Sequence, residues 1–337
     1  MTSRLLSAAG FLTKIPVPGW ALMDQASLAA SPPYFPAVGA GIGIGLAAFD
    51  RLVARLFPLP VACILDLVLL FVVTGGMHCD GLIDTADGLL GGTTREDALH
   101  IMRDSRIGAM GAIAAVLLIL AKYALLISLP VLLSGTWRLA VSEISNSLCK
   151  TSAGALQIGI VKLRITGFPG RLNLAGSLLP FHILPLRGRL PALLLAPVMG
   201  RWVMLLAISI FPYARKENGM GIVFASSGRE FGKAQGQKQE QEQGRRAVHD
   251  QGKGQNQKQG NDRRLRSRLY VSAVVTVILG TVVAGTRGAL AFTLCSLVTL
   301  LWGRRVSAFL GGLTGDIYGA LCEICEVVTL LVFCVGI

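Results

Sequence analysis

The sequence predicts an all-α protein that crosses a membrane about six or seven times, as one membrane-embedded domain over residues 1–337. Hydrophobic residues make up 53% of the chain and charged residues only 15%, whereas soluble domains have about 25% charged residues. Apolar runs close to the length of a membrane helix recur from end to end. The net charge of +13 collects between these runs, as it does in cytoplasmic loops of membrane proteins. Nucleic-acid binding is therefore a poor interpretation of the charge.

The apolar runs predict the helices in order. They cover residues 35–57, 61–77, 107–133, 191–212, 269–286, 288–302 and 316–337. Lys122 interrupts the third run and Arg201 the fourth. The glycines at positions 39, 41, 43 and 45 have no preceding strand, so we interpret them as small residues that let membrane helices approach closely. The seven cysteines are an odd and scattered set, which excludes a disulfide framework.

Two segments differ from this pattern. Residues 228–268 hold 11 Lys or Arg and 5 Asp or Glu with almost no apolar residues. Such a tract cannot bury enough apolar surface to offset its ordering entropy, so we predict a disordered polar insertion. Residues 134–190 are mixed in composition, and the sequence assigns them no role.

An acidic cluster follows the second apolar run. Asp80, Asp84 and Asp87 are spaced i, i+4 and i+7, so on a helix their carboxylates share one face. Three like charges at a membrane boundary repel one another, and a Mg²⁺ ion resolves this because it prefers carboxylate and phosphate oxygens. The alternative is a solvated polar turn, which the interleaved Leu82 and Ile83 disfavour. The sequence therefore predicts a metal site formed by these three aspartates.

A polar helix is predicted next, over residues 95–106, with Thr93 and Glu96 as a capping box. Arg103 and Arg106 would share a face and grip phosphate oxygens, and Asp104 would complete the carboxylate set. An interfacial helix whose arginines meet lipid headgroups explains the same residues equally well. Lys122 either snorkels to the membrane surface or faces the polar site, and we expect the second.

A second acidic cluster lies in the last apolar run. Asp316, Glu323 and Glu326 are spaced seven and three residues apart, which places them on one helix face. Carboxylates in so apolar a helix usually have a function. Binding a second metal ion, pairing with arginines and hydrogen bonding to a substrate all remain open.

Three of these segments resemble the cobalamin synthase family. They are Asp80-Gly-Leu-Ile-Asp84-Thr-Ala-Asp87-Gly88, Ile101-Met-Arg103-Asp104-Ser-Arg106-Ile-Gly108 and Gly311-Gly-Leu-Thr-Gly-Asp316. The segments Phe11-Leu-Thr-Lys-Ile-Pro16-Val-Pro18, Tyr34-Phe-Pro36 and Tyr213-Ala-Arg215-Lys-Glu-Asn-Gly219-Met-Gly221 also resemble it in order. The resemblance covers residues 4–133, 191–226 and 269–337, and the insertion at 228–268 has no counterpart in it.

The resemblance implies a Mg²⁺-dependent transferase that is integral to the cell membrane. Enzymes of this family join adenosylcobinamide-GDP to α-ribazole or its 5′-phosphate and release GMP. Asp80, Asp84 and Asp87 would then bind the metal, Arg103, Arg106 and Lys122 would face phosphate, and Asp104 or Asp87 would act catalytically. Nucleotide substrates would place the acidic cluster on the cytoplasmic side. The sequence leaves open the oligomeric state, the orientation of the termini and the preferred form of α-ribazole.

Two other functions fit parts of the sequence. A CDP-alcohol phosphotransferase of phospholipid synthesis also uses an aspartate cluster in a membrane, but its motif has Ala-Arg where this chain has Asp84-Thr85. An ion-coupled transporter has buried carboxylates and broken helices. A transporter of that kind shows repeated halves, and the two acidic clusters of this chain do not match each other.

Overall fold

The computed structural model describes residues 2–19, 25–129, 189–215 and 251–335. Contacts divide the chain into two units, and one of them, Val131–Leu184, lies outside the described residues. The other unit, Met1–Pro130 with Pro185–Ile337, is helical in its described part. Its elements are α1 (Thr2–Leu12), α3 (Gln25–Ala29), the short 3-10 helix η1 (Pro32–Tyr34), α4 (Phe35–Leu56), α5 (Leu59–Thr74), α6 (Met77–Gly91), α7 (Arg95–Ile101), α8 (Ala109–Ser128), α10 (Leu190–Ile210), α13 (Gln251–Ala284), α14 (Thr286–Leu310) and α15 (Gly315–Cys334).

The prediction of an all-α membrane protein is confirmed. Within the described residues, five spans are long and apolar enough to cross a membrane, namely α4 with η1, α8, α10, α14 and α15. A sixth is the α5–α6 pair, if it counts as one span bent by 89°. The apolar part of α13, Leu269–Ala284, is shorter. Large apolar side chains such as Val68, Leu117 and Val275 are exposed, as expected of surfaces that meet lipid rather than water.

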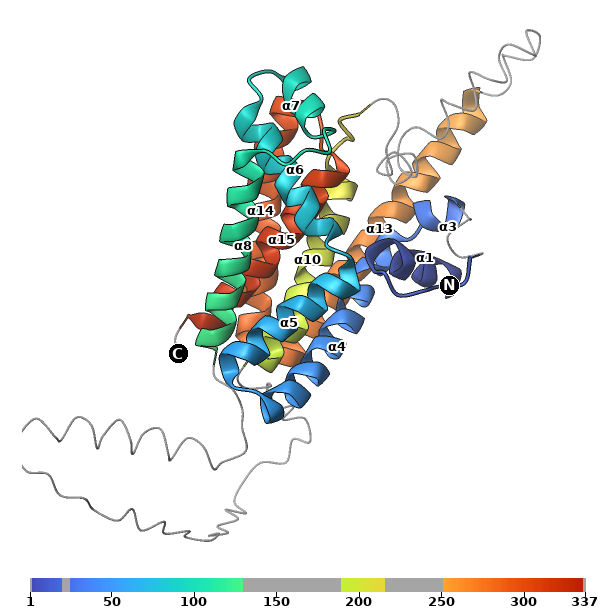
Figure 1. The fold of residues 1–337 in the computed structure, drawn as a ribbon. Coiled ribbons are helices and arrows are strands. Elements are labelled where there is room, and N and C mark those ends of the chain that lie inside the picture. The colour runs from blue at the N-terminus through green and yellow to red at the C-terminus, as the bar shows by residue number, and fades with distance from the viewer. Residues whose placement is uncertain (1, 20–24, 130–188, 216–250, 336–337) are drawn as a thin grey trace, which may run out of the picture. The chain divides into compact units, whose positions relative to one another are not determined.

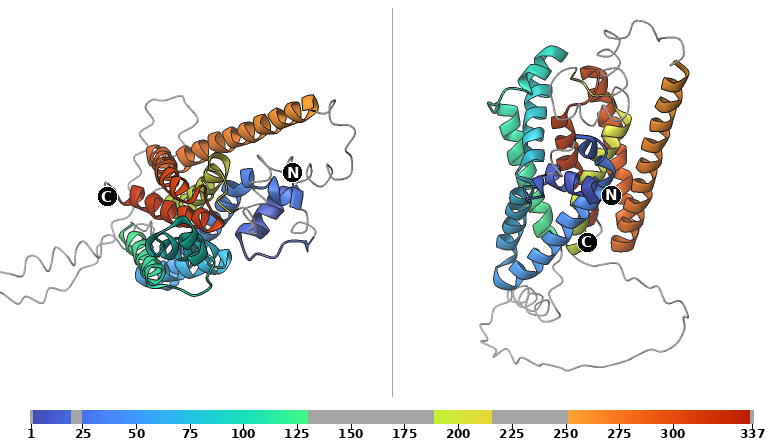
Figure 2. Two further views of the ribbon diagram at one scale, coloured as in Figure 1. Left: turned by 90° about the horizontal axis from the view of Figure 1, so that it is seen from above. Right: turned by 90° about the vertical axis from the view of Figure 1, so that its right-hand side faces the viewer.

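Helix α10 is the central element of this unit. Its residues are buried almost continuously from Leu190 to Ala207, and it packs against α4, α15, α13 and α14. Figures 1 and 2 show these helices around α10. Because α10 is covered on all sides, its two arginines, Arg189 at the N-cap and Arg201 in the middle, are both buried.

Glycines set the distance between α4 and α10. A Cβ atom at Gly39 would lie 2.4 Å from the Pro197 backbone oxygen, and one at Gly43 would lie 2.2 Å from the Leu194 oxygen. Gly41 and Gly45, on the other side of α4, have nothing within 4 Å of such an atom. The predicted role in close helix approach therefore applies to Gly39 and Gly43.

We expect Gly43→Val to destabilise the protein by about 1–3 kcal/mol, because the backbones of α4 and α10 must separate to admit the side chain. Gly45→Val on the same helix is the matched control and is expected to change stability little. The measurement is the unfolding midpoint of both variants in detergent. Equal midpoints for the two variants would contradict the close packing described here.

Two local predictions differ from the structure. Helix α7 ends at Ile101 rather than at residue 106, and its cap is Thr94, whose Oγ1 accepts a hydrogen bond from Asp97 N at 3.2 Å. Beyond it, Asp104 Oδ1 accepts the backbone N–H of Arg106 at 3.0 Å, a local bond that competes with continued helix. Residues 251–268 form the first half of α13; the Gln, Lys and Arg residues there favour helix, whereas the three glycines do not. The rest of the predicted insertion, up to residue 250, lies outside the described residues.

Candidate active site

The acidic cluster lies on a helix that begins at a glycine turn. Gly75 and Gly76 have φ angles of 65° and 69°, a left-handed conformation that glycine adopts without steric cost. The turn between α5 and α6 allows the 89° bend of the chain, and α6 starts at Met77. Asp80, Asp84 and Asp87 therefore lie on one helix, as predicted.

A second glycine turn delivers Asp316 to the same place. Gly311, with φ 72°, ends α14 in the left-handed conformation. Thr314 caps α15, and its Oγ1 accepts the N–H of Ile317 at 3.4 Å. Asp316 consequently lies in the first turn of α15, where the helix dipole favours a negative charge.

Helices α6 and α15 are in direct backbone contact beside these carboxylates. A Cβ atom at Gly81 would lie 2.7 Å from the Asp316 backbone oxygen, and one at Gly319 would lie 3.1 Å from the oxygen of His78. This approach brings Asp84 into electrostatic interaction with Asp316, in addition to Asp80 of its own helix. The site therefore combines carboxylates from both sequence clusters, a pairing that the sequence analysis did not predict.

A cation joins the site from the segment after α10. Ala214 N donates to the Leu313 oxygen at 2.9 Å, so this segment runs beside the turn that precedes α15. Arg215 Nη2 then donates to Asp316 Oδ2 at 2.8 Å. Arg95 Nη2 donates to the Ala214 oxygen at 3.2 Å and holds the segment from the other side. Arg215 is a site residue that the sequence analysis did not identify as one.

These side chains border a cavity of ≈ 240 Å³. Asp80, Arg215 and Asp316 form its charged edge. The remaining wall is mainly apolar and aromatic, with side chains from α1, α6, α10, α15 and the segment after α10, including Phe11, Met77, Met204, Ile208, Tyr213 and Tyr318. Burial raises the pKa of Tyr213, so its hydroxyl is protonated at neutral pH. The arrangement offers carboxylates and a guanidinium beside a pocket for a flat apolar group.

Asp87, which the sequence analysis predicts as a metal ligand, contacts the start of α8. Its carboxylate accepts the N–H of Gly108 and the N–H of Gly111, both at 2.8 Å, and so caps the start of α8. It does not line the cavity. Throughout the described ranges, no three His, Cys, Asp or Glu residues are close enough together to hold a metal ion. The predicted ligand set of Asp80, Asp84 and Asp87 is therefore not assembled in this structure.

The Arg103–Arg106 segment is irregular and exposed. Arg106 donates to Asp104 at 2.5 Å, and this bond lowers the pKa of the Asp104 carboxyl to about 2. A carboxylate with so low a pKa is a weak base at neutral pH, so this bond does not favour a base role, and the catalytic role of Asp104 stays a prediction. Arg103 lies within electrostatic range of Tyr213, near the cavity. The two arginines do not share a helix face, because α7 ends before them.

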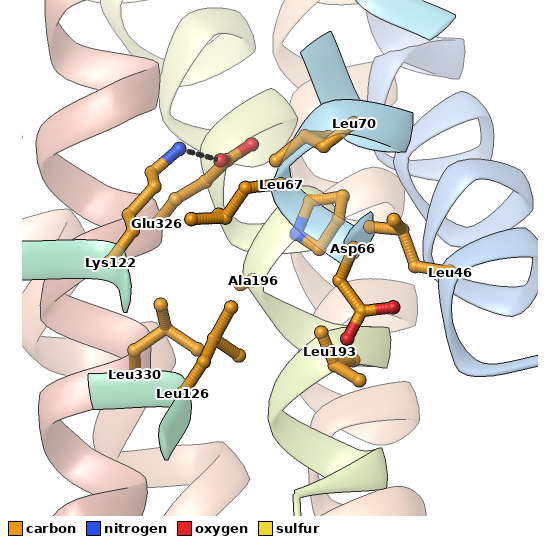
Figure 3. Close-up of a pocket in the computed structure, with 11 residues that line it drawn as sticks. Leu46, Asp66, Leu67, Leu70, Lys122, Leu126, Leu193, Ala196, Glu326 and Leu330 are labelled. Atoms are coloured by element: carbon orange, nitrogen blue, oxygen red, sulfur yellow. Dashed lines mark hydrogen bonds and ion pairs between the residues drawn. The ribbon is translucent and has the colours of Figure 1, made fainter. Parts of the chain in front are cut away.

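Lys122 lies in a buried ion cluster, which comprises Lys122, Arg201, Glu323 and Glu326. Its Nζ donates to Glu323 and, at 2.5 Å, to Glu326, and Arg201 donates to Glu326. Figure 3 shows Lys122 of α8 reaching Glu326 of α15 above an apolar cavity. Both carboxylates of the last helix engage Lys122 here, and its contact with phosphate stays a prediction. Of the open options for Glu323 and Glu326, the structure shows pairing with cations.

His78 connects the cavity to the buried ion cluster. It lines the cavity, is only 1% exposed and interacts electrostatically with Arg201 and Glu326. Neither ring nitrogen has a hydrogen-bond partner among the described residues. Another buried cluster lies elsewhere in the unit, where Arg189 pairs with Asp50 and, at 2.6 Å, with Asp66. Asp50 and Asp66 lie within apolar helices, and this pattern in the sequence indicates that they need a buried partner.

Comparison with known proteins gives a family model, described as cobalamin-5-phosphate synthase, that matches residues 4–168, 171–235 and 244–334. The chain is 33% identical over 324 residues to an adenosylcobinamide-GDP ribazoletransferase of Roseiflexus sp. (strain RS-1), covering 96% of this chain and 86% of that one. It is 29% identical over 328 residues to a protein of that name from Desulfitobacterium hafniense (strain Y51), covering 97% and 95%. No solved structure matches it significantly.

The family match also corrects the extent of the resemblance. It includes residues 134–168 and most of the segment 228–268, which the sequence analysis left without counterparts. Only residues 169–170 and 236–243 interrupt the match between its ends. The polar tract therefore lies within the family match except for residues 236–243.

Proposed function

The chain belongs to the cobalamin-5-phosphate synthase family, and from this membership we propose that it joins adenosylcobinamide-GDP to α-ribazole or its 5′-phosphate and releases GMP. The membrane-spanning helices make it an integral membrane protein. The observation that carries the proposal within the structure is the meeting of Asp80, Asp316 and Arg215 at one edge of a cavity. Charged groups of both signs beside a pocket suit the transfer of a phosphoryl group.

The proposed reaction is a displacement at phosphorus. A ribose hydroxyl of the α-ribazole attacks the phosphorus that carries the cobinamide's aminopropanol arm, and an O–P bond forms as the hydroxyl proton is lost. The P–O bond of the diphosphate breaks, and GMP leaves with the bonding electrons. Negative charge increases on the leaving phosphate, so a fixed cation nearby lowers the barrier.

Arg215 is the residue best placed to supply that charge. Its guanidinium is held by Asp316 at 2.8 Å, and its side chain is only 11% exposed. A planar guanidinium binds phosphate oxygens in bidentate geometry. The Asp316 partner keeps the side chain oriented when the cavity has no phosphate in it. We propose that the diphosphate of adenosylcobinamide-GDP lies along this edge.

We propose Mg²⁺ as the cofactor, on the chemistry of the donor set. Asp80 and Asp316 offer hard carboxylate oxygens at the charged edge, and Asp84 of the same helix as Asp80 interacts electrostatically with both. Mg²⁺ is usually bound by one or two protein carboxylates together with substrate phosphates, so a preformed set of three ligands is not required. Asp80 and Asp84 would hold the ion, which neutralises diphosphate charge when bound.

We also propose that the membrane is the cell membrane and that the cavity opens toward the cytoplasm. Several arginines lie at the end of the helix bundle where the cavity is found, including Arg95, Arg103, Arg304 and Arg305. Cytoplasmic segments of membrane proteins carry an excess of such residues. A nucleotide-linked substrate is also consistent with this side.

The proposal predicts Mg²⁺-dependent turnover that is limited to one membrane face. Inverted and right-side-out vesicles containing the protein are supplied with adenosylcobinamide-GDP, α-ribazole 5′-phosphate and Mg²⁺. GMP and the corrinoid product are then followed by chromatography with mass detection. We expect equal amounts of both products in inverted vesicles, and neither in right-side-out vesicles nor with EDTA. Folded protein that forms no cobalamin-type product in any vesicle would refute the assigned reaction.

A further inference from the structure

We propose that the 240 Å³ cavity binds the bicyclic aromatic base of the acceptor nucleoside, α-ribazole, and that the corrinoid and the guanine lie outside it. This inference rests on the proposed function and names the substrate group that this part of the site receives. Three observations carry it, namely the chemistry of the cavity wall, its size and its position relative to Arg215.

The wall suits a flat, apolar ring. Phe11 contributes from α1, Met204 and Ile208 from α10, Tyr213 from the segment after α10, and Tyr318 from the first turns of α15. Aromatic and thioether side chains pack well against aromatic rings. Three ionic side chains, Asp80, Asp316 and Arg215, form one edge, and the lining also includes His78. A ligand there must be apolar along most of its body and polar at one end.

The size of the cavity excludes the largest substrate group. Pockets for drug-sized ligands measure about 300–1,000 Å³, and this one is slightly smaller at ≈ 240 Å³. A heterobicyclic base with part of its ribose matches that volume. A corrin macrocycle with its amide side chains is several times larger, so it must bind elsewhere.

The apolar wall favours a benzimidazole over guanine. Guanine carries exocyclic oxygen and amino groups and a ring N–H, and each of them would lose its hydrogen bonds to water against side chains such as Ile208 and Met204. The dimethylbenzimidazole of α-ribazole has no exocyclic polar group. Its methyl groups gain from burial against apolar side chains.

The position of the cavity also fits the reaction. With the base among Tyr213, Tyr318 and Ile208, the attached ribose would extend to the charged edge where Arg215 and Asp316 lie. The attacking hydroxyl would then be next to the proposed diphosphate. The acceptor occupies the cavity and the donor's reacting phosphorus lies at its mouth, which is the arrangement that an in-line displacement needs.

Binding measurements on two variants of α10 test the inference. Ile208→Trp fills the cavity, and Ile210→Trp, at an exposed position of the same helix, is the matched control. Each protein in nanodiscs is titrated separately with α-ribazole and with adenosylcobinamide-GDP by calorimetry. We expect Ile208→Trp to weaken α-ribazole binding by about tenfold or more, as blocking a shaped pocket does, and to leave adenosylcobinamide-GDP binding unchanged. The control is expected to bind both like the wild type.

A smaller substitution keeps the inference testable if Ile208→Trp does not fold. The thiol of Ile208→Cys is alkylated, and its rate of modification is followed by peptide mass analysis, with Ile210→Cys as control. We expect α-ribazole to protect Ile208→Cys and GMP not to protect it. Protection of Ile208→Cys by GMP, or loss of adenosylcobinamide-GDP binding in Ile208→Trp, would overturn the assignment. Unchanged α-ribazole binding by Ile208→Trp, or no protection of Ile208→Cys by α-ribazole, would overturn it as well. Wild-type protein that binds neither substrate would instead overturn the proposed function itself.

Discussion

Asp84→Asn is expected to lower transferase turnover by on the order of 10²–10³-fold, the loss that follows removal of one group that stabilises charge in a transition state. Asp84 interacts with Asp80 and Asp316 from the middle of α6, and an amide there cannot replace a carboxylate oxygen toward Mg²⁺. The fold should survive, because no described helix is capped by this side chain. Turnover at saturating substrates, together with the apparent Mg²⁺ requirement, provides the measurement.

The matched control is Asp87→Asn, one helical turn further along the same helix. The Asp87 carboxylate accepts two backbone N–H groups at the start of α8, and asparagine caps helices about as well as aspartate. We expect this variant to keep most of the wild-type turnover and to lose some stability. Equal losses of turnover in both variants would show that Asp87 acts on substrate or metal, as the sequence spacing alone suggested, and would contradict its placement here.

The helices could be predicted because their signal is local. A run of about 20 apolar residues has few outcomes other than a membrane span. The helix that carries Asp80 follows from neighbouring residues in the same way, whereas the predicted apolar run 61–77 passes through the turn at Gly75 and Gly76, where α5 ends and α6 begins. Segments without such a strong signal were less predictable. Just beyond the end of α7, the Arg106 backbone N–H donates to Asp104 Oδ1 at 3.0 Å, a local bond that no periodicity reveals.

The composition of the site could not be predicted because it depends on pairs distant in sequence. Asp316, Glu323 and Glu326 do share a helix face, but at 1.5 Å per residue Asp316 lies about 10 Å from Glu323 along α15. Asp316 therefore meets Arg215 at the helix start, while Glu323 meets Lys122 inside the helix bundle. The close approach of α6 and α15 at Gly81 and Gly319 sets which residues of α15 lie beside the carboxylates of α6. The sequence shows which residues are costly to bury without a partner, but not which partner they find.

We expect the buried ion cluster to be sensitive to the loss of any one of its charges, because its four charges cancel. Lys122 and Arg201 provide two positive charges, and Glu323 and Glu326 provide two negative ones. Lys122→Met removes one positive charge and leaves both carboxylates to share Arg201. Removing one partner of a buried pair costs about 3–5 kcal/mol, so we expect low yield and early unfolding in detergent. Lys122→Met with Glu323→Gln restores neutrality and is expected to recover most of that loss.

The same pair of variants separates the two roles considered for Lys122. If the lysine only balances charge between α8 and α15, the neutral double variant should show turnover close to the wild type once it is folded. If it acts on phosphate, the double variant should fold but lose turnover, with a raised KM for adenosylcobinamide-GDP. We expect the first result, because Lys122 is 5% exposed and both carboxylates of α15 already accept its hydrogen bonds. Recovery of stability without recovery of turnover would return Lys122 to the phosphate-binding set.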